Sequence, residues 1–75
     1  MRVWYPNLVI ILGRNGLSQK GIAEKAGISE AVFSRHYRSH KGFTLLEMEK
    51  IRKAIWSLTG IRYSLDELFR RGIEE

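Results

Sequence analysis

The chain has 75 residues, a net charge of +5 and no cysteine. A chain this short, with no disulfide to stabilise it, requires a compact core built from helices. Its 44% hydrophobic and 28% charged residues exclude a disordered or low-complexity chain. The apolar run of residues 8–12 is too short to cross a bilayer and lacks the flanks of a signal peptide. We therefore expect one cytoplasmic domain over residues 1–75, with no membrane partner.

The first predicted helix begins at Pro6, a residue that suits a first helical turn. Gly13 and Gly16 follow the apolar run and suit a helix stop. The apolar residues of this segment are dense enough that a short strand is the alternative. Apolar spacing along the rest of the chain predicts four more helices and no convincing strand.

The second and third helices are predicted from their caps. Ser18 is the expected N-cap of residues 19–26, and Gly27 ends that helix. Ser29 is the expected N-cap of a third helix at about residues 30–37. Because the second helix and the second cap are so close in sequence, the two helices must cross steeply.

The fourth and fifth helices each begin with capping-box spacing: Thr44 with Glu47, and Ser64 with Glu67. A helical stripe in the fourth helix predicts its core side, namely Leu45, Met48, Ile51, Ile55 and Leu58. The fifth helix is expected to turn Leu65, Leu68 and Phe69 inward and to have Arg70 and Arg71 at the C-terminal end of its dipole. These patterns together predict an all-α chain.

Positive charge is concentrated in the middle of the chain. Residues 14–41 contain six Lys or Arg against two Glu, whereas residues 42–75 contain six bases and six acids. The stretch GISEAVFSRHYRSHKG, residues 27–42, has Glu30 as its only carboxylate. A solvated surface is the plain interpretation of such a cluster, but its position on one predicted helix and the following turn favours a face that binds a polyanion.

The segment LSQKGIAEKAGISEAVFSR, residues 17–35, has the residues that a helix-turn-helix needs. Ala23 is small enough for close helix contact, and Gly27 permits a left-handed turn. Apolar contacts that fix the crossing angle are available from Ile22, Ile28 and Phe33.

This segment resembles the Cro/phage-repressor-type (xenobiotic-response-element) family of helix-turn-helix proteins. The motifs YPNL, FTLLEMEKI and SLDELF extend the resemblance to about residues 5–69, in the short form found among regulators of phages and mobile elements of Gram-positive bacteria. The resemblance implies a compact five-helix lambda-repressor-like DNA-binding domain whose third helix enters the major groove. It also implies a sequence-specific transcriptional regulator that binds double-stranded DNA, and we expect this regulator to be a repressor.

Carried over position by position, the base-reading residues of the family fall on Glu30, Ala31, Ser34 and Arg35. Backbone contacts fall on Gln19 and on the turn after the third helix. Helical geometry agrees, because turning Phe33 and Tyr37 inward leaves Ala31, Arg35 and Arg38 on the opposite side.

Physical roles follow from side-chain chemistry. Arg35 has the planar fork that reads guanine O6 and N7 together, Glu30 could accept from a cytosine amino group or repel a misplaced phosphate, and Ala31 could touch a thymine methyl. The residues expected to bind phosphate oxygens are Gln19, Lys20, Arg38, His40 and Lys41.

Other functions have less support in the sequence. His36 and His40 lack a third metal ligand, the capping serines lack a histidine and acid partner, and no paired carboxylates or phosphate loop occur, so we expect no enzyme, metal, cofactor or small-molecule ligand. Trp4 and Trp56 are expected in the core or at its rim. The alternative function is a protein-interaction module, such as an antitoxin or antirepressor, whose basic face binds an acidic partner. If the protein binds DNA, we expect it to bind a two-fold symmetric DNA site as a homodimer.

Overall fold

The computed structural model describes residues 5–39 and 41–71, and these residues form five α-helices and no strand. The helices are α1 (Pro6–Arg14), α2 (Gln19–Ala26), α3 (Glu30–Tyr37), α4 (Leu45–Thr59) and α5 (Leu65–Phe69). The all-α prediction is confirmed for this part of the chain, and the first apolar segment is a helix rather than a strand. No helix among these residues is long and apolar enough to cross a membrane.

Each predicted cap is present and starts its helix where the sequence places it. Ser18 Oγ accepts the Gly21 N–H at 2.9 Å, and Ser29 Oγ accepts the Val32 N–H at 3.2 Å. Both capping boxes form, at the starts of α4 and α5. These bonds satisfy amides that the first helical turn leaves without partners, and so they fix the helix boundaries locally.

The turn between α2 and α3 depends on Gly27. Its φ of 75° is left-handed, a conformation that other residues adopt only at a cost. The amide of the following residue, Ile28, donates to the carbonyl of Ala23 at 2.9 Å. Ile28 is buried, so the turn is anchored to the core as well as bent.

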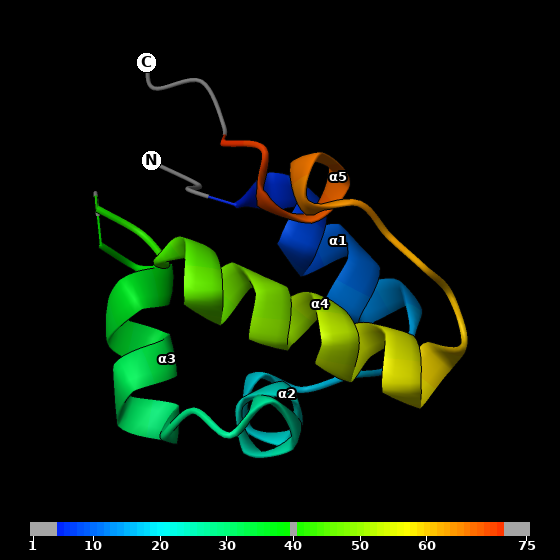
Figure 1. Cartoon of the computed structure of the whole chain (residues 1–75), viewed down its shortest axis with the longest axis horizontal. Coiled ribbons are helices and arrows are strands. Elements are labelled where there is room, and N and C mark those ends of the chain that lie inside the picture. Colours follow the sequence, from blue (N-terminus) through cyan, green and yellow to red (C-terminus); the bar gives the residue numbers. More distant parts are fainter. Residues whose placement is uncertain (1–4, 40, 72–75) are drawn as a thin grey trace.

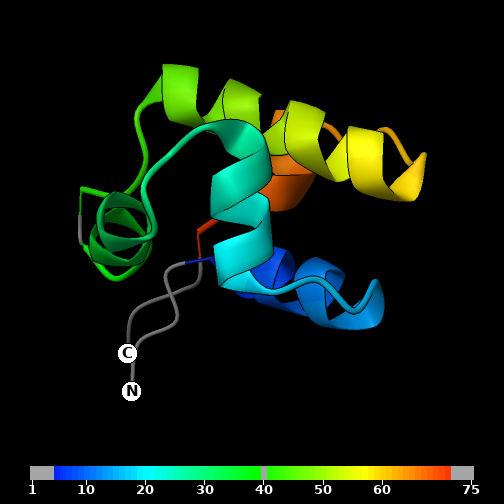
Figure 2. The same cartoon turned by 90° about the horizontal axis from the view of Figure 1, so that it is seen from below.

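The helix α4 lies across the molecule, with α2 on one side of it and α1 and α5 on the other (Figure 1). The view from below shows α3 at one end of the molecule, beside α2 and away from α1 (Figure 2). A cluster of aromatic rings joins the chain's first described residue to two helices, α3 and α5, and to the turn before α4. Its members are Tyr5, Phe33, Tyr37, Phe43 and Phe69, with neighbouring ring centroids 5.1 to 6.4 Å apart.

The predicted core stripe of α4 is partly wrong. Ile51 and Ile55 are buried and Met48 packs against the core, but Leu45 is 63% exposed and Leu58 is 47% exposed. Ala54, which was not in the predicted stripe, is also buried. The buried side of α4 is therefore rotated about the helix axis relative to the predicted stripe, and Leu45 lies outside it. Leu58 lies in the last turn of α4 and is about half exposed there.

Candidate nucleic-acid interface

The side of α3 that faces away from the core carries most of the predicted base-reading residues. Phe33 is fully buried and Tyr37 packs against the core from the same side. Burial raises the pKa of the Tyr37 phenol, and the charge of Arg38 opposes this rise only in part. The four exposed residues of α3 and its C-cap are Glu30, Ala31, Arg35 and Arg38, whereas Ser34 is half-buried at the margin of this side.

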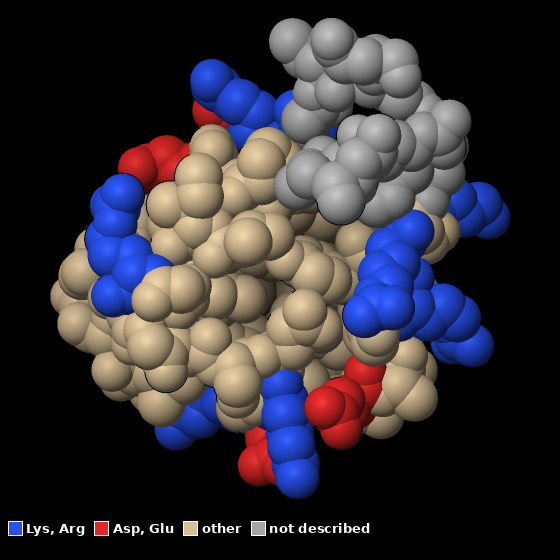
Figure 3. All heavy atoms as spheres, turned by 180° about the vertical axis from the view of Figure 1, so that it is seen from behind, with Lys and Arg blue, Asp and Glu red and all other residues tan. Residues whose placement is uncertain are grey.

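Arg35 and Arg38 hold no ion pair with any described residue. Glu30 is at the start of α3, about one and a half turns before Arg35 and about two turns before Arg38, so it cannot neutralise both. Seen from behind, Lys and Arg side chains gather along the edge of the molecule where α3 lies, with some acidic atoms below them (Figure 3). Positive side chains therefore gather on this edge of the molecule, with acidic atoms beside them.

The start of α2 approaches the end of α3. Gln19, the first residue of α2, lines a depression with Tyr37 of α3 and with Leu17 before it. The next residue, Lys20, is exposed. The Ser18 side chain accepts the Gly21 amide at the start of α2. The amides of Gln19 and Lys20, in the same first turn, point along the helix axis away from α2, as at the start of any α-helix.

The turn after α3 brings Lys41 close to Arg35. Both residues line a hollow of about 480 Å³, together with His36, Ser39, Gly42, Phe43 and Thr44. Lys41 is exposed, and its amide donates to Ser39 Oγ at 3.2 Å, which bends the turn. His40, the remaining residue predicted to bind phosphate, lies outside the described residues.

Two residues that sequence reasoning missed hold this turn in position. The Tyr5 hydroxyl, buried in the core, accepts the Phe43 amide at 3.0 Å. Arg71 donates to the Lys41 carbonyl at 2.7 Å and to the Tyr5 hydroxyl at 3.4 Å, and its guanidinium carbon lies 5.3 Å from the Tyr5 ring centroid. Arg70 and Arg71 follow the C-terminal end of α5, as expected from the sequence. The contacts of Arg71 with the turn before α4 were not predicted, and Arg70 pairs with Asp66 of α5 at 2.6 Å.

A further link joins α3 to α4. His36 Nδ1 lies 2.8 Å from Glu47 Oε1, and the same carboxylate oxygen accepts the Thr44 amide at 2.9 Å within the capping box. Burial acts to raise the pKa of Glu47, but the hydrogen bonds from Thr44 and His36 outweigh it and hold that pKa below its ordinary value. The carboxylate is therefore a charged connection between the helix that carries Arg35 and the start of α4.

The tryptophan in the described residues lies far from this surface along α4. Trp56, at the start of the last turn of α4, is 42% exposed, and the guanidinium carbon of Arg62 lies 4.5 Å from its ring centroid. It is a rim residue, as expected, and it is at the opposite end of α4 from Lys41. Trp4 lies outside the described residues.

Comparisons with protein-family models, with curated proteins and with solved structures found no match to this chain. The function must therefore be inferred from the residues and their geometry. The relevant geometry is one exposed helix side with two arginines that form no ion pair within the described part of the chain, flanked by the start of α2 and by the turn that carries Lys41.

Proposed function

We propose that this protein is a sequence-specific transcriptional regulator of double-stranded DNA, with α2 and α3 as a helix-turn-helix in a lambda-repressor-like fold. The observation that carries the proposal is the exposed basic side of α3, whose arginines pair with no acid among the described residues and which lies between the start of α2 and the turn that carries Lys41. An α-helix fits the major groove of B-DNA, and phosphates on either side require contacts from neighbouring elements. The resemblance of residues 5–69 to Cro/phage-repressor-type proteins supports a phage or mobile-element repressor acting in the cytoplasm.

In this proposal α3 reads bases and its neighbours bind the backbone. Arg35 reads guanine, Ala31 contacts a thymine methyl, and Glu30 and Ser34 select or reject bases at the margins. The backbone contacts come from Gln19, Lys20, Arg38, His40 and Lys41, which fix the register without reading the sequence. Arg71 and Tyr5 act on Lys41 through its turn and are positioning residues.

The second candidate function is a protein-interaction module whose same basic face binds an acidic protein. It is favoured by the fact that Arg35, Arg38 and Lys41 would attract any dense polyanion. Salt dependence separates the two functions. DNA binding through about six phosphate contacts predicts a log–log slope near −5 for affinity against salt concentration. An acidic protein predicts a shallower slope and no preference among duplexes.

The decisive experiment is the selection of bound duplexes from a random pool, followed by salt titration with the best sequence. A DNA-binding regulator is expected to enrich a two-fold motif and to bind it with the steep slope. A pool that stays random, together with a shallow slope, would contradict sequence-specific DNA binding.

A further inference from the structure

The outer side of α1 is both apolar and exposed. Val9 is 46% exposed and Ile10 is 54% exposed. Pro6 and Gly13 lie on the same side of the helix, one turn before and one turn after them. Arg14, the last residue, is the only charged residue of α1. We call the side formed by Pro6, Val9, Ile10 and Gly13 the α1 face.

Gly13 is not explained by the packing of a single chain. A Cβ at this position would meet no described atom within 4 Å, so an alanine would fit. The backbone of Gly13 is helical and does not need the left-handed freedom of glycine. Glycine inside a helix is less stable than alanine. The close approach of a second backbone to the α1 face would account for it.

Two hollows flank the α1 face. One has a volume of about 280 Å³, and its lining residues are Asn7, Ile10, Ile11, Arg14, Tyr63 and Glu67. The other has a volume of about 290 Å³, and its lining residues are Val9, Leu12, Gly13, Leu17, Gln19 and Tyr37. A helix ridge with a hollow on each side is complementary to a second copy of itself, because each ridge can enter a hollow of the other copy.

The charges beside the α1 face also suit a second copy. The ring centroid of Phe69 lies 5.8 Å from that of Tyr5, so the end of α5 lies beside the start of α1. Glu67, two residues before Phe69, is therefore near the first turn of α1, whereas Arg14 is at the end of α1. Within the described residues, Glu67 and Arg14 form no ion pair with each other. If two copies pack with α1 antiparallel, Arg14 of each copy faces Glu67 of the other.

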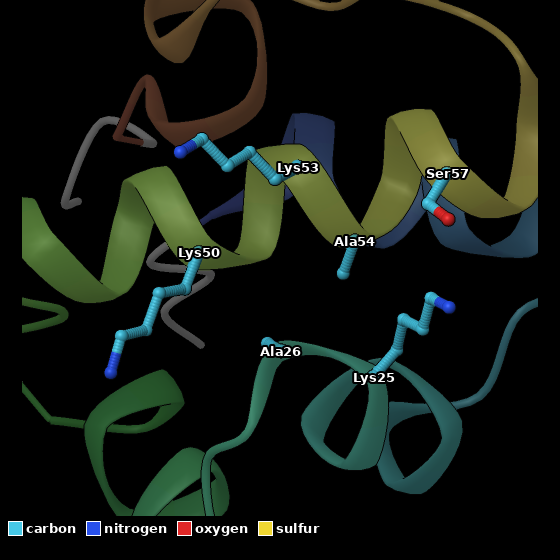
Figure 4. A pocket seen from close by; sticks show the side chains of 6 residues that line it. All are labelled: Lys25, Ala26, Lys50, Lys53, Ala54 and Ser57. Atoms are coloured by element: carbon cyan, nitrogen blue, oxygen red, sulfur yellow. The ribbon is translucent and has the colours of Figure 1, made fainter.

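The α1 face lies on the side of the molecule opposite α4 (Figure 2). Seen from behind, this side has charged side chains around its edge and residues of other kinds across its middle (Figure 3). The side of α4 differs. Lys25, Lys50 and Lys53 border the hollow between α2 and α4, and the last two extend from α4 in different directions (Figure 4). A second copy placed there would bring like charges together, so the α1 face is the better surface for self-association.

We propose that the α1 face packs against the α1 face of a second copy, in an antiparallel two-fold dimer of the free protein. The contact removes Val9 and Ile10 from water. Because α1 is only about 14 Å long, the contact is smaller than the roughly 800 Å² per partner of a stable interface, and we expect a dissociation constant of about 100 µM. Gln19, a proposed phosphate contact, lines one of the two hollows. This dimer is therefore separate from the contact between two copies on one DNA site.

The test measures the mass of the full chain by sedimentation equilibrium without DNA, from about 10 µM to about 1 mM. Ile10→Glu places two carboxylates near the two-fold axis and should weaken association at least about tenfold. Leu46→Glu is the matched control. Leu46, on α4, is 64% exposed, and the same change there should alter association less than about twofold. An unmodified chain that stays monomeric, or equal effects of the two changes at unchanged helical circular dichroism, would overturn the proposal.

Charge reversal tests the antiparallel arrangement directly. Arg14→Glu and Glu67→Arg should each associate more weakly than the unmodified chain, because like charges then meet across the contact. An equimolar mixture of the two variants should associate at least about fivefold more tightly than either variant alone, since both contacts of the mixed dimer again join opposite charges. An ion pair within one chain cannot produce this gain. A mixture that associates no better than the separate variants, with both variants helical by circular dichroism, would contradict the proposed dimer. No measurement includes DNA, so such a result would leave the proposed DNA binding unaffected.

Discussion

Arg35 is the residue on which the proposed base recognition depends most. Replacing Arg35 by alanine should relax the base preference at one position and cost about 1 to 3 kcal/mol of discrimination, because a bidentate contact to guanine is lost. Binding to duplexes that differ at single positions measures this. Lys41→Ala is the control, since loss of a phosphate contact should weaken all duplexes alike and reduce the salt slope by about one. Unchanged specificity in Arg35→Ala would rule out its proposed role.

Gly42 sits in the turn that carries Lys41, with a φ of 74°. A Cβ at this position would collide with the Tyr5 hydroxyl and with the Arg71 guanidinium, so Gly42→Ala combines backbone strain with a clash. We expect a loss of about 2 to 4 kcal/mol in the free energy of unfolding, measured with urea. Gly60→Ala is the matched control. Its φ is 75° but a Cβ there would meet open space, so it should lose only about 1 kcal/mol. If Gly42→Ala and Gly60→Ala lose the same free energy of unfolding, Tyr5 and Arg71 move aside without cost and the predicted clash is absent.

At the scale of the elements, Glu47 connects α3 to α4 through a side chain that is 17% exposed. Because its pKa is lowered in the folded chain, ionised Glu47 stabilises the fold above its ordinary pKa of 4.5. That contribution is lost as the pH falls through the lower, folded pKa. Glu47→Gln keeps a capping-box side chain but removes the charge opposite His36, and it should cost about 1 kcal/mol at pH 7.

The cost of Glu47→Gln should shrink in acid, as the wild-type carboxylate becomes protonated. Glu67→Gln provides the control, because Glu67 completes the equivalent capping box of α5 and is not bonded to His36, the histidine that the structure describes. Urea denaturation at several pH values measures both. A loss in Glu47→Gln that matches Glu67→Gln, or that stays constant down to pH 3, would show that the His36 contact contributes nothing.

Helix boundaries could be predicted from the sequence because caps are local signals. Ser18 and Ser29 bond to amides three residues away, so a short stretch of sequence contains the whole interaction. The exposure of Leu45 could not be predicted, because periodicity shows a helix face but not which neighbours cover it. Arg71 was missed for a different reason. It contacts Tyr5, which is 66 positions away, and no local pattern indicates such a pair.

The same difference applies to the candidate site. The exposure of Arg35 and Arg38 follows from the helical period once Phe33 is assigned to the core. The shared hollow of Arg35 and Lys41 depends instead on a turn held by residues from both ends of the described chain. The residues of the site could therefore be predicted from the sequence, but the contacts of Tyr5 and Arg71 that hold the turn in position could not.

At the scale of the whole molecule, size constrains how two copies would bind one DNA site. The Cα atoms span 34 Å along the longest axis and 21 to 22 Å across the others. Half-sites one helical turn apart are separated by about 34 Å, so two adjacent copies reach both without a linker. Candidate contacts between copies are α5, the exposed apolar residues of α4 such as Trp56 and Leu58, and Trp4, which lies outside the described residues.

This geometry predicts a strict dependence on half-site spacing. Inserting about five base pairs between the half-sites turns the second copy to the opposite side of the duplex, where it cannot touch the first. Affinity should then fall to that of a duplex with one half-site, and the complex should contain one copy at concentrations where the unmodified site binds two. Binding curves with light scattering measure both quantities. If the insertion leaves affinity unchanged and two copies still bind, the copies act independently and the proposed dimer is wrong, while base reading by Arg35 would be unaffected.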